Sequence, residues 1–349
     1  MNVLITSAGR RNYLVEYFRA ALGGAGKVIA VDANPRAPAL IEADLAFVVP
    51  PFTSSAYMPA VRELVRSHGV RLALSVHDDD ALVLAEHAQA LRGDGCLTLI
   101  SAPETVALVS DKLALGRFCG RNGIAYPATF SSPEQALRAV GSQEVGFPLI
   151  LKPRFGSASK GLSLIDGPED LEPAVHTTRG MLRRQAPGAP GLDKSEIVLQ
   201  EYVAGAEFGV DVVNDPRGGY TATLARRKLE MRSGETEKAV TVREPILEAF
   251  GRRLGTTLGH VGCMDCDAIV TDAAVVLLDA NPRLGGGYPF VHEAGADLPA
   301  AFLAWAEGRP ADPSCFQYEA GVTGMKCDRL VTTRDPVGPG SVEPLVMHE

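Results

Sequence analysis

The sequence predicts an α/β domain at the N-terminus, followed by an α+β region. Two observations predict this fold class: apolar runs alternate with amphipathic helical segments over residues 1–104, and hairpin-like pairs of strands take over from residue 148. The chain has 349 residues, 46% of them hydrophobic and 22% charged, which is ordinary globular composition. That length is enough for two or three packed domains.

The first domain is predicted from strands and helices that alternate along the chain. The predicted strands are residues 2–7, 27–33, 72–76 and 97–101, with helices at 13–22, 58–69 and 81–91. Strands separated by helices of this length imply a parallel sheet with right-handed crossovers. Residues 1–104 are therefore expected to form a Rossmann-like domain.

A smaller unit is expected over residues 105–202. Residues 103–123 have a helical pattern, and residues 124–130, which include a proline, have an extended one. The stretch PLILKPRFGSASKGLSLI, residues 148–165, predicts two strands around a loop of small residues, and IVLQEYV, residues 197–203, predicts another strand.

The rest of the chain predicts a larger α+β unit over residues 203–330. It contains a helix near residues 243–259 and largely antiparallel strands. The Pro- and Gly-rich stretch 183–196 indicates a mobile surface loop. Residues 331–349 have weak periodicity and are expected to form a loose tail.

Charge and composition exclude several classes of function. The formal net charge is −8, and no run of Lys and Arg gives the basic footprint of a nucleic-acid-binding protein. No apolar stretch approaches the ~18 residues that span a membrane, so we expect a cytoplasmic protein. Six cysteines are too few for a disulfide scaffold. The pair Cys263 and Cys266 is interpreted as part of a buried strand, with a metal or redox role as the alternative.

A cluster of oxygen ligands is predicted in GCMDCDAIVTDAAVVLLDANPR, residues 262–283. If the two strands of this stretch pair as a hairpin, Asp279 and Asn281 share a face and Asp267 lies across the ladder from them. Two carboxylates and an amide oxygen suit Mg²⁺, which also binds through substrate phosphates. The alternative is a strand-ending turn with surface acids.

Charged and small residues flank this cluster in the sequence. Arg283, just after Pro282, is suited to stabilise a transferring phosphoryl group, and Gly285–Gly287 would let the backbone come close to that group. Lys152 ends a strand before the loop 156–161, whose backbone N–H groups can fold over phosphates. The alternative for that loop is a flexible hairpin with a solvated lysine.

A nucleotide slot is suggested by IVLQEYVAGAEFGVDVV, residues 197–213. An adenine needs a strip of backbone hydrogen bonds beside an apolar slot, and a ribose needs an acceptor for its hydroxyls. Glu201, Val203 and Glu207 can supply both. The alternative is a strand edge with solvated acids.

These stretches, together with Lys112 in SDKLALGRF, occur in the order and spacing of the ATP-grasp superfamily. The chain resembles, over residues 1–310, the stand-alone enzymes similar to the carbamoyl phosphate synthase large subunit. This resemblance implies a pre-ATP-grasp domain and two α+β lobes that clamp Mg-ATP, with Mn²⁺ as a possible substitute for Mg²⁺. It departs from the family in Asp279, where the usual residue is Glu.

The resemblance also implies roles for individual residues. Those expected to contact ATP are Lys112, Lys152, Ser157, Ser159, Gly161, Glu201, Val203 and Glu207. Those expected to bind magnesium are Asp267, Asp279 and Asn281, and those expected at the reaction centre are Arg283 and Lys160.

The reaction implied is that of a carboxylate–amine ligase. ATP phosphorylates a small, amino-acid-like carboxylate, and an amine displaces the phosphate from the acyl phosphate, so that catalysis is largely positioning and charge neutralisation. The alternatives are a bicarbonate-activating phosphotransferase like carbamoyl phosphate synthase and a non-catalytic nucleotide-binding module. Small-molecule carboxylate and amine substrates are the expected partners, and a homodimer is common in the family.

Substrate-binding residues are expected at the ends of strands in the first domain. Arg10 follows the first strand at the start of a helix, where anions bind. Asp78 or Asp79 is suited to bind the ammonium of an amino-acid-like substrate while Arg232 or Arg283 binds its carboxylate. The alternative for the acids is a helix-capping run.

Overall fold

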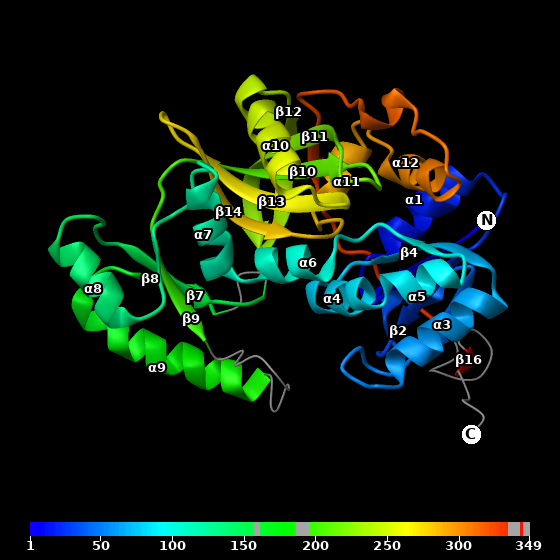
Figure 1. The fold of residues 1–349 in the computed structure, drawn as a ribbon, viewed down its shortest axis with the longest axis horizontal. Helices are drawn as coiled ribbons and strands as arrows, with labels where there is room; N and C mark the ends of the chain where they lie inside the picture. The colour runs from blue at the N-terminus through cyan, green and yellow to red at the C-terminus, as the bar shows by residue number, and fades with distance from the viewer. Residues whose placement is uncertain (157–160, 186–195, 334–342, 345–349) are drawn as a thin grey trace.

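The computed structural model of the chain describes residues 1–156, 161–185, 196–333 and 343–344. These residues form three sheets, two of six strands and one of four. In Figure 1 the N-terminal sheet lies on the right, the four-stranded sheet lies at the lower left, and the second six-stranded sheet lies above and between them. None of the helices in the described part of the chain is long and apolar enough to cross a bilayer.

The N-terminal sheet is parallel throughout, in the order β16-β3-β2-β1-β4-β5. Its strands are β1 (Asn2–Thr6), β2 (Val28–Asp32), β3 (Leu45–Val48), β4 (Val70–Ser75), β5 (Leu97–Thr98) and β16 (Glu343–Pro344). Its helices are α1 (Asn12–Leu22), α2 (Pro38–Glu42), α3 (Tyr57–Ser67), α4 (Asp78–Glu86) and α5 (Ala88–Gly93). The apolar strands are buried because helices cover both faces of the sheet. The predicted α/β fold is confirmed here.

The smaller sheet is antiparallel, in the order β6-β9-β7-β8. Helices α6 (Pro103–Ser110) and α7 (Lys112–Arg121) precede it in the chain. Its elements are β6 (Thr129–Phe130), α8 (Pro133–Gly141), β7 (Leu149–Pro153), β8 (Ser163–Ile165), α9 (Pro168–Gln185) and β9 (Ile197–Glu201). The two strands predicted within 148–165 pair as β7 and β8, whereas the expected mobile loop, residues 183–196, lies largely outside the described residues.

The third sheet has the order β14-β13-β10-β11-β12-β15 and is antiparallel. Its elements are β10 (Ala206–Asn214), β11 (Tyr220–Arg232), β12 (Glu235–Val242), α10 (Pro245–Leu258), β13 (Gly262–Val270), β14 (Val275–Asn281) and β15 (Thr323–Met325). On one face, Val210, Val212 and Met264 pack in a core with Phe250 of α10. Because side chains alternate along a strand, the other face carries the intervening charged residues.

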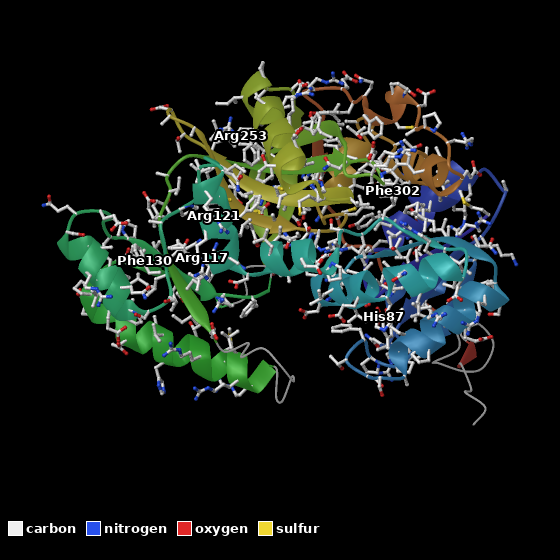
Figure 2. All side chains as sticks on the ribbon, in the orientation of Figure 1. His87, Arg117, Arg121, Phe130, Arg253 and Phe302 are labelled. Atoms are coloured by element: carbon white, nitrogen blue, oxygen red, sulfur yellow. The ribbon has the colours of Figure 1, made fainter. Side chains whose placement is uncertain are left out.

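The end of helix α10 is tied to the helix that precedes the small sheet. Arg253 donates from its guanidinium to the carbonyl of Asn122, directly after α7, at 2.8 Å. Figure 2 labels Arg253 on α10 and Arg121 on α7 in this region. The contact joins the C-terminal end of α7, the helix that carries Lys112, to α10.

The chain after β14 returns to the N-terminal sheet. The elements involved are α11 (Tyr288–His292), α12 (Leu298–Ala306) and the 3-10 turn η1 (Pro313–Phe316). Leu298 and Phe302 share one hydrophobic core with Leu14 and Phe18 of α1. The core of the first domain therefore takes residues from both halves of the chain, and the predicted domain bounds remain a prediction.

Two predicted helices are each divided in two. The segment 103–123 breaks at Asp111, which is extended and accepts hydrogen bonds from the N–H groups of Leu113 and Ala114 as the N-cap of α7. The segment 81–91 breaks at His87, between α4 and α5. Of the expected loose tail, the structure describes residues 331–333 and β16, which adds to the N-terminal sheet beside β3.

Candidate active site

Strands β13 and β14 pair as the predicted hairpin, so the predicted magnesium ligands lie together. Asp267 stands directly opposite Asp279, and Asp265 stands opposite Asn281. Asp279 and Asn281 are two residues apart and share the polar face of the sheet with Asp267. The arrangement presents two carboxylates and an amide oxygen on one surface.

Two lysines from other elements reach this hairpin. Lys112, in the first turn of α7, is buried; its Nζ donates to the carbonyl of Gly156 at 2.7 Å and lies 3.9 Å from Asp279 Oδ1. Lys152, at the end of β7, donates to the carbonyl of Leu278 at 3.5 Å. Burial lowers the pKa of Lys152 to about 8, although the carboxylate of Asp279 opposes the shift. The tertiary structure thus brings both predicted phosphate-contacting lysines to β14.

An ion pair holds the start of α7 beside β7. Arg154 donates to Asp111 from Nε at 2.8 Å and from a terminal nitrogen at 2.6 Å, and it also pairs with Glu196. Asp111 caps the helix that begins with Lys112. Sequence reasoning did not single out Asp111 or Arg154, and the only local signal was a capping residue immediately before the lysine.

The predicted nucleotide residues lie along the path from β9 to β10. Glu201 ends β9; its N–H donates to the carbonyl of Ala128 at 3.0 Å, and its carboxylate accepts from the N–H of Ala128 at 3.3 Å. Val203 follows and is half-buried. Glu207, on β10, accepts from Lys228 at 2.7 Å.

Lys228 joins the predicted ribose acceptor to the predicted metal site. Its Nζ lies 2.7 Å from Glu207 and 2.6 Å from Asp267. Burial alone would lower the pKa of Lys228, but the two carboxylates outweigh it and raise that pKa above its ordinary value. Burial also raises the pKa of Asp267, against the opposing effect of Lys228.

The predicted phosphate loop lies mostly outside the described residues. Ser157, Ser159 and the predicted catalytic Lys160 belong to the undescribed range 157–160. Gly161 is described, with a φ of +76°, and a Cβ there would lie 2.6 Å from Met181 Cε. Glycine at this position therefore satisfies both a left-handed backbone and a close approach to α9.

Arg283 is held by carboxylates from two directions. Its Nε lies 2.7 Å from Asp78 Oδ1, and one terminal nitrogen lies 3.2 Å from Asp265 Oδ2. Asp265 in turn lies 3.1 Å from Arg226, whose other terminal nitrogen lies 2.5 Å from Asp211. We name these five residues, Asp78, Arg283, Asp265, Arg226 and Asp211, the charge chain.

Sequence reasoning missed three members of the charge chain. Asp211, Arg226 and Asp265 lie on the same face of the large sheet as Asp267. The available signal was the charged residues within largely apolar strands, in VDVV and MDCD; ARRK, with three consecutive charged residues, shows no such alternation.

The three glycines after Arg283 make room for side chains of this region. A Cβ on Gly285 would lie 2.1 Å from Asp265 Cγ, and one on Gly287 would lie 2.2 Å from Arg226 Nε. A Cβ on Gly286 would lie 3.1 Å from a terminal nitrogen of Arg11. From the sequence we expected these glycines to let the backbone approach a phosphoryl group. In the structure they make room for packed guanidinium and carboxylate groups.

The predicted substrate residues form two groups. Arg10 and Arg232 both pair with Asp328, at 3.5 and 3.0 Å, on the exposed surface. Asp78 and Asp79 lie in the first turn of α4, where Asp78 faces Arg283 and Asp79 is exposed. At the predicted anion site after β1, one of the protein's own acids is bound, because the N–H of Gly9 donates to Asp32 at 2.8 Å.

The cysteines of the CxxC pair are both buried and free. Cys263 and Cys266 lie on opposite faces of β13, one in the core with α1 and the other in the core with α10. Among the described residues, no three His, Cys, Asp or Glu side chains form a group able to hold a metal. Any magnesium at Asp267 and Asp279 would therefore rely on the amide of Asn281 and on nucleotide phosphates for its other ligands.

Two sequence families match parts of the chain. Residues 3–99 match the PylC-like N-terminal domain, and residues 193–326 match the family described as ATP-grasp in the biosynthetic pathway with Ter operon. The carbamoyl phosphate synthase large chain of Rubrobacter xylanophilus is 25% identical over 271 residues, which is 72% of this chain and 24% of the relative. That of Thermus thermophilus is 28% identical over 228 residues, 62% of this chain and 21% of the relative. The chain thus spans about a quarter of the length of these relatives.

Solved structures share the fold across nearly the whole chain. Biotin carboxylase from Campylobacter jejuni superposes with a TM-score of 0.72 at 17% identity, covering 91% of this chain and 73% of that one. N5-carboxyaminoimidazole ribonucleotide synthetase from Thermotoga maritima gives 0.62 at 19% identity, covering 92% and 79%. The biotin carboxylase domain of Hydrogenobacter thermophilus 2-oxoglutarate carboxylase, solved as a dimer with MgADP and bicarbonate, gives 0.70 at 16% identity, covering 88% and 70%.

Proposed function

The chain is an ATP-grasp protein with a PylC-like N-terminal domain, and we propose that it is an ADP-forming ligase that joins a small carboxylate to an amine. One observation carries the proposal. Lys112 and Lys152, from elements that precede the large sheet in sequence, converge on the hairpin that holds Asp267 and Asp279. Cations beside paired carboxylates suit a polyphosphate that carries a divalent metal.

In this proposal the nucleotide lies between the small and large sheets. Lys112 and Lys152 neutralise phosphate oxygens, Glu201 and Val203 border the adenine, and Glu207 accepts from the ribose hydroxyls once it exchanges its contact with Lys228. Ser157, Ser159, Lys160 and Gly161 would cover the phosphates.

The donor set at the hairpin fits magnesium, with manganese as a substitute. Asp267, Asp279 and Asn281 supply hard oxygens on one face, and the side-chain nitrogen of Asn281 donates to the carbonyl of Asp265 at 3.4 Å, which leaves its oxygen for a ligand. When bound, the metal would neutralise charge on the transferring phosphoryl group.

The reaction needs positioning rather than a protein nucleophile. The substrate carboxylate attacks the γ-phosphorus of ATP, ADP leaves, and the amine then displaces phosphate from the acyl phosphate. Arg283 is the side chain we assign to the developing negative charge. Asp79, exposed in the first turn of α4, is the candidate for the ammonium of an amino-acid-like substrate, and an unchanged amino-acid KM in the Asp79→Asn enzyme would contradict that role.

The test is release of ADP from Mg-ATP against pools of amino acids and small carboxylates, with mass spectrometry of the products. We expect release that requires a pool and a product mass equal to acid plus amine minus water. Asp279→Ala should abolish it, whereas Asp272→Ala, an exposed acid in the turn of the same hairpin, should not. Pools that all stay silent while ATP binds would instead favour a nucleotide-binding module. Light scattering of the same sample tests whether the chain is a homodimer.

A second candidate is activation of bicarbonate, as in the large chains of carbamoyl phosphate synthase to which the sequence is similar. It is the weaker proposal, because the chain spans 24% of that relative. ADP release that depends on bicarbonate alone, with no organic carboxylate present, would favour it over the ligase.

A further inference from the structure

Arg283 lies where two parts of the protein meet. Its guanidinium side chain is only 9% exposed, and it contacts Asp78 of the N-terminal domain and Asp265 of the large sheet. We propose that Asp78 and Asp265 are positioning residues that fix the guanidinium of Arg283, and that Asp78 acts through Arg283 rather than by binding substrate. The inference rests on the proposed function in its assignment of Arg283 to the reaction centre.

The contacts fix both the location and the plane of the guanidinium. A terminal nitrogen donates to Asp78 Oδ2 at 3.2 Å, and Nε lies 2.7 Å from Asp78 Oδ1 as an ion-pair contact without hydrogen-bond geometry. The other terminal nitrogen donates to Asp265 at 3.2 Å and to the carbonyl of Leu284 at 3.3 Å. A planar group held by these hydrogen bonds and by the ion pair with Asp78 cannot rotate without breaking the contacts to Asp78, Asp265 and Leu284.

Asp265 is itself held in place by three groups. One carboxylate oxygen accepts from Arg226 at 3.1 Å, the other accepts from Arg283, and its backbone carbonyl accepts from the amide of Asn281. Arg226 is anchored by the fully buried Asp211. Asp265 therefore links a predicted metal ligand, Asn281, to the reaction-centre arginine, because its backbone carbonyl contacts Asn281 and its carboxylate contacts Arg283.

Asp78 and Asp79 are adjacent in sequence but differ in what they contact. The side chain of Asp78 is 17% exposed against Arg283, whereas Asp79 is exposed on the same helix turn. This difference separates a positioning role from a substrate-binding role. Loss of Asp78 should disturb Arg283, and loss of Asp79 should leave the contacts of Arg283 with Asp78 and Asp265 in place.

The first test uses the side-chain Nε–H resonance of Arg283 in ¹⁵N-labelled full-length protein, assigned by its absence in Arg283→Lys. In Asp78→Asn we expect this resonance to shift and its exchange with solvent to accelerate at least about tenfold, because a buried guanidinium loses a charged partner. Asp79→Asn is the matched control and should leave both unchanged. An unmoved resonance in Asp78→Asn, or an equal change in Asp79→Asn, would overturn the proposal.

Asp265→Asn tests the same inference from the opposite side and serves if Asp78→Asn does not fold. This substitution should shift the resonances of the protons on the terminal nitrogens of Arg283, while the circular dichroism spectrum remains that of the wild type. Unshifted resonances would again overturn the inference. Once a substrate is known, Asp78→Asn should lower kcat by about tenfold or more with KM within about twofold, and Asp78→Glu should recover part of kcat. The NMR measurements do not require the protein to turn over a substrate. Their result can therefore be interpreted even if the chain proves not to be a ligase.

Discussion

Gly285→Ala is the substitution whose consequence follows most directly from the structure. A methyl group at this position would lie 2.1 Å from Asp265 Cγ and 2.2 and 2.3 Å from its carboxylate oxygens. The backbone of Gly285 is not left-handed, so alanine meets no backbone strain and the effect is purely one of space. Either the loop or the carboxylate of Asp265 must move.

The magnitude depends on which of the two moves. Inserting a methyl group into a packed site costs about 1–3 kcal/mol, and the reduced freedom of the unfolded chain returns about 0.4–1 kcal/mol. If Asp265 turns away instead, Arg226 and Arg283 lose a partner, and breaking such a buried pair costs about 3–5 kcal/mol. We expect a net loss of about 2 kcal/mol, with the larger value as the upper limit.

The assay is urea unfolding followed by circular dichroism and by the fluorescence of Trp305, the only tryptophan. Gly286→Ala is the matched control, because its Cβ would meet only the end of the Arg11 side chain, at 3.1 Å, and that side chain is 21% exposed and can shift. It should change stability by no more than about 0.5 kcal/mol. If Gly285→Ala were as stable as Gly286→Ala, the packing argument for the glycines would be refuted.

Three further predictions concern the rest of the molecule. Burial lowers the pKa of His260 to about 4, whereas the same side chain in the unfolded protein binds a proton below about pH 6.5, so the free energy of unfolding should fall by about 2 kcal/mol from pH 7 to pH 5. Urea unfolding should show a smaller fall for His260→Gln, and an equal fall in both proteins would contradict this. Native protein should react rapidly with a thiol reagent at one position, Cys327, since the other five cysteines are buried; a second fast thiol, or a fast thiol remaining in Cys327→Ser, would be inconsistent with the fold. Phe302→Ala should cost about 3–5 kcal/mol in unfolding free energy because the ring fills the core shared by α1 and α12, and a loss under about 1 kcal/mol would mean that α12 does not support that core.

Local pattern was sufficient to predict the hairpin that carries the predicted metal ligands. The run VVLLDAN has the β-branched and apolar character of a strand, and the turn TDAA lies between it and DCDAIV. Since side chains in a strand alternate with a period of two residues, Asp279 and Asn281 had to share a face whatever the rest of the fold. The short turn alone would pair Asp267 with Leu278; a register shift between Asp267 and Ala268 brings Asp267 opposite Asp279, and the sequence pattern did not predict that bulge.

The hydrophobic pattern was not sufficient to predict a break inside a segment with helical periodicity. The segment 103–123 has helical periodicity across its whole length, yet Asp111 ends one helix and caps the next. Asp111 accepts the capping hydrogen bonds of α7 and also pairs with Arg154, a residue on another element. No window of sequence around Asp111 contains that partner.

The sequence by itself determined the type and order of most elements, the shared face of Asp279 and Asn281, and the residues that match the ATP-grasp pattern. These features depend on the repeat of a helix or strand, which acts over a few residues. Only the tertiary structure decided that Arg283 pairs with Asp78, 205 residues away, and that α12 completes the core around α1. Such contacts depend on which apolar faces pack together and on which buried charges find partners, and neither is encoded in the spacing of residues along the chain.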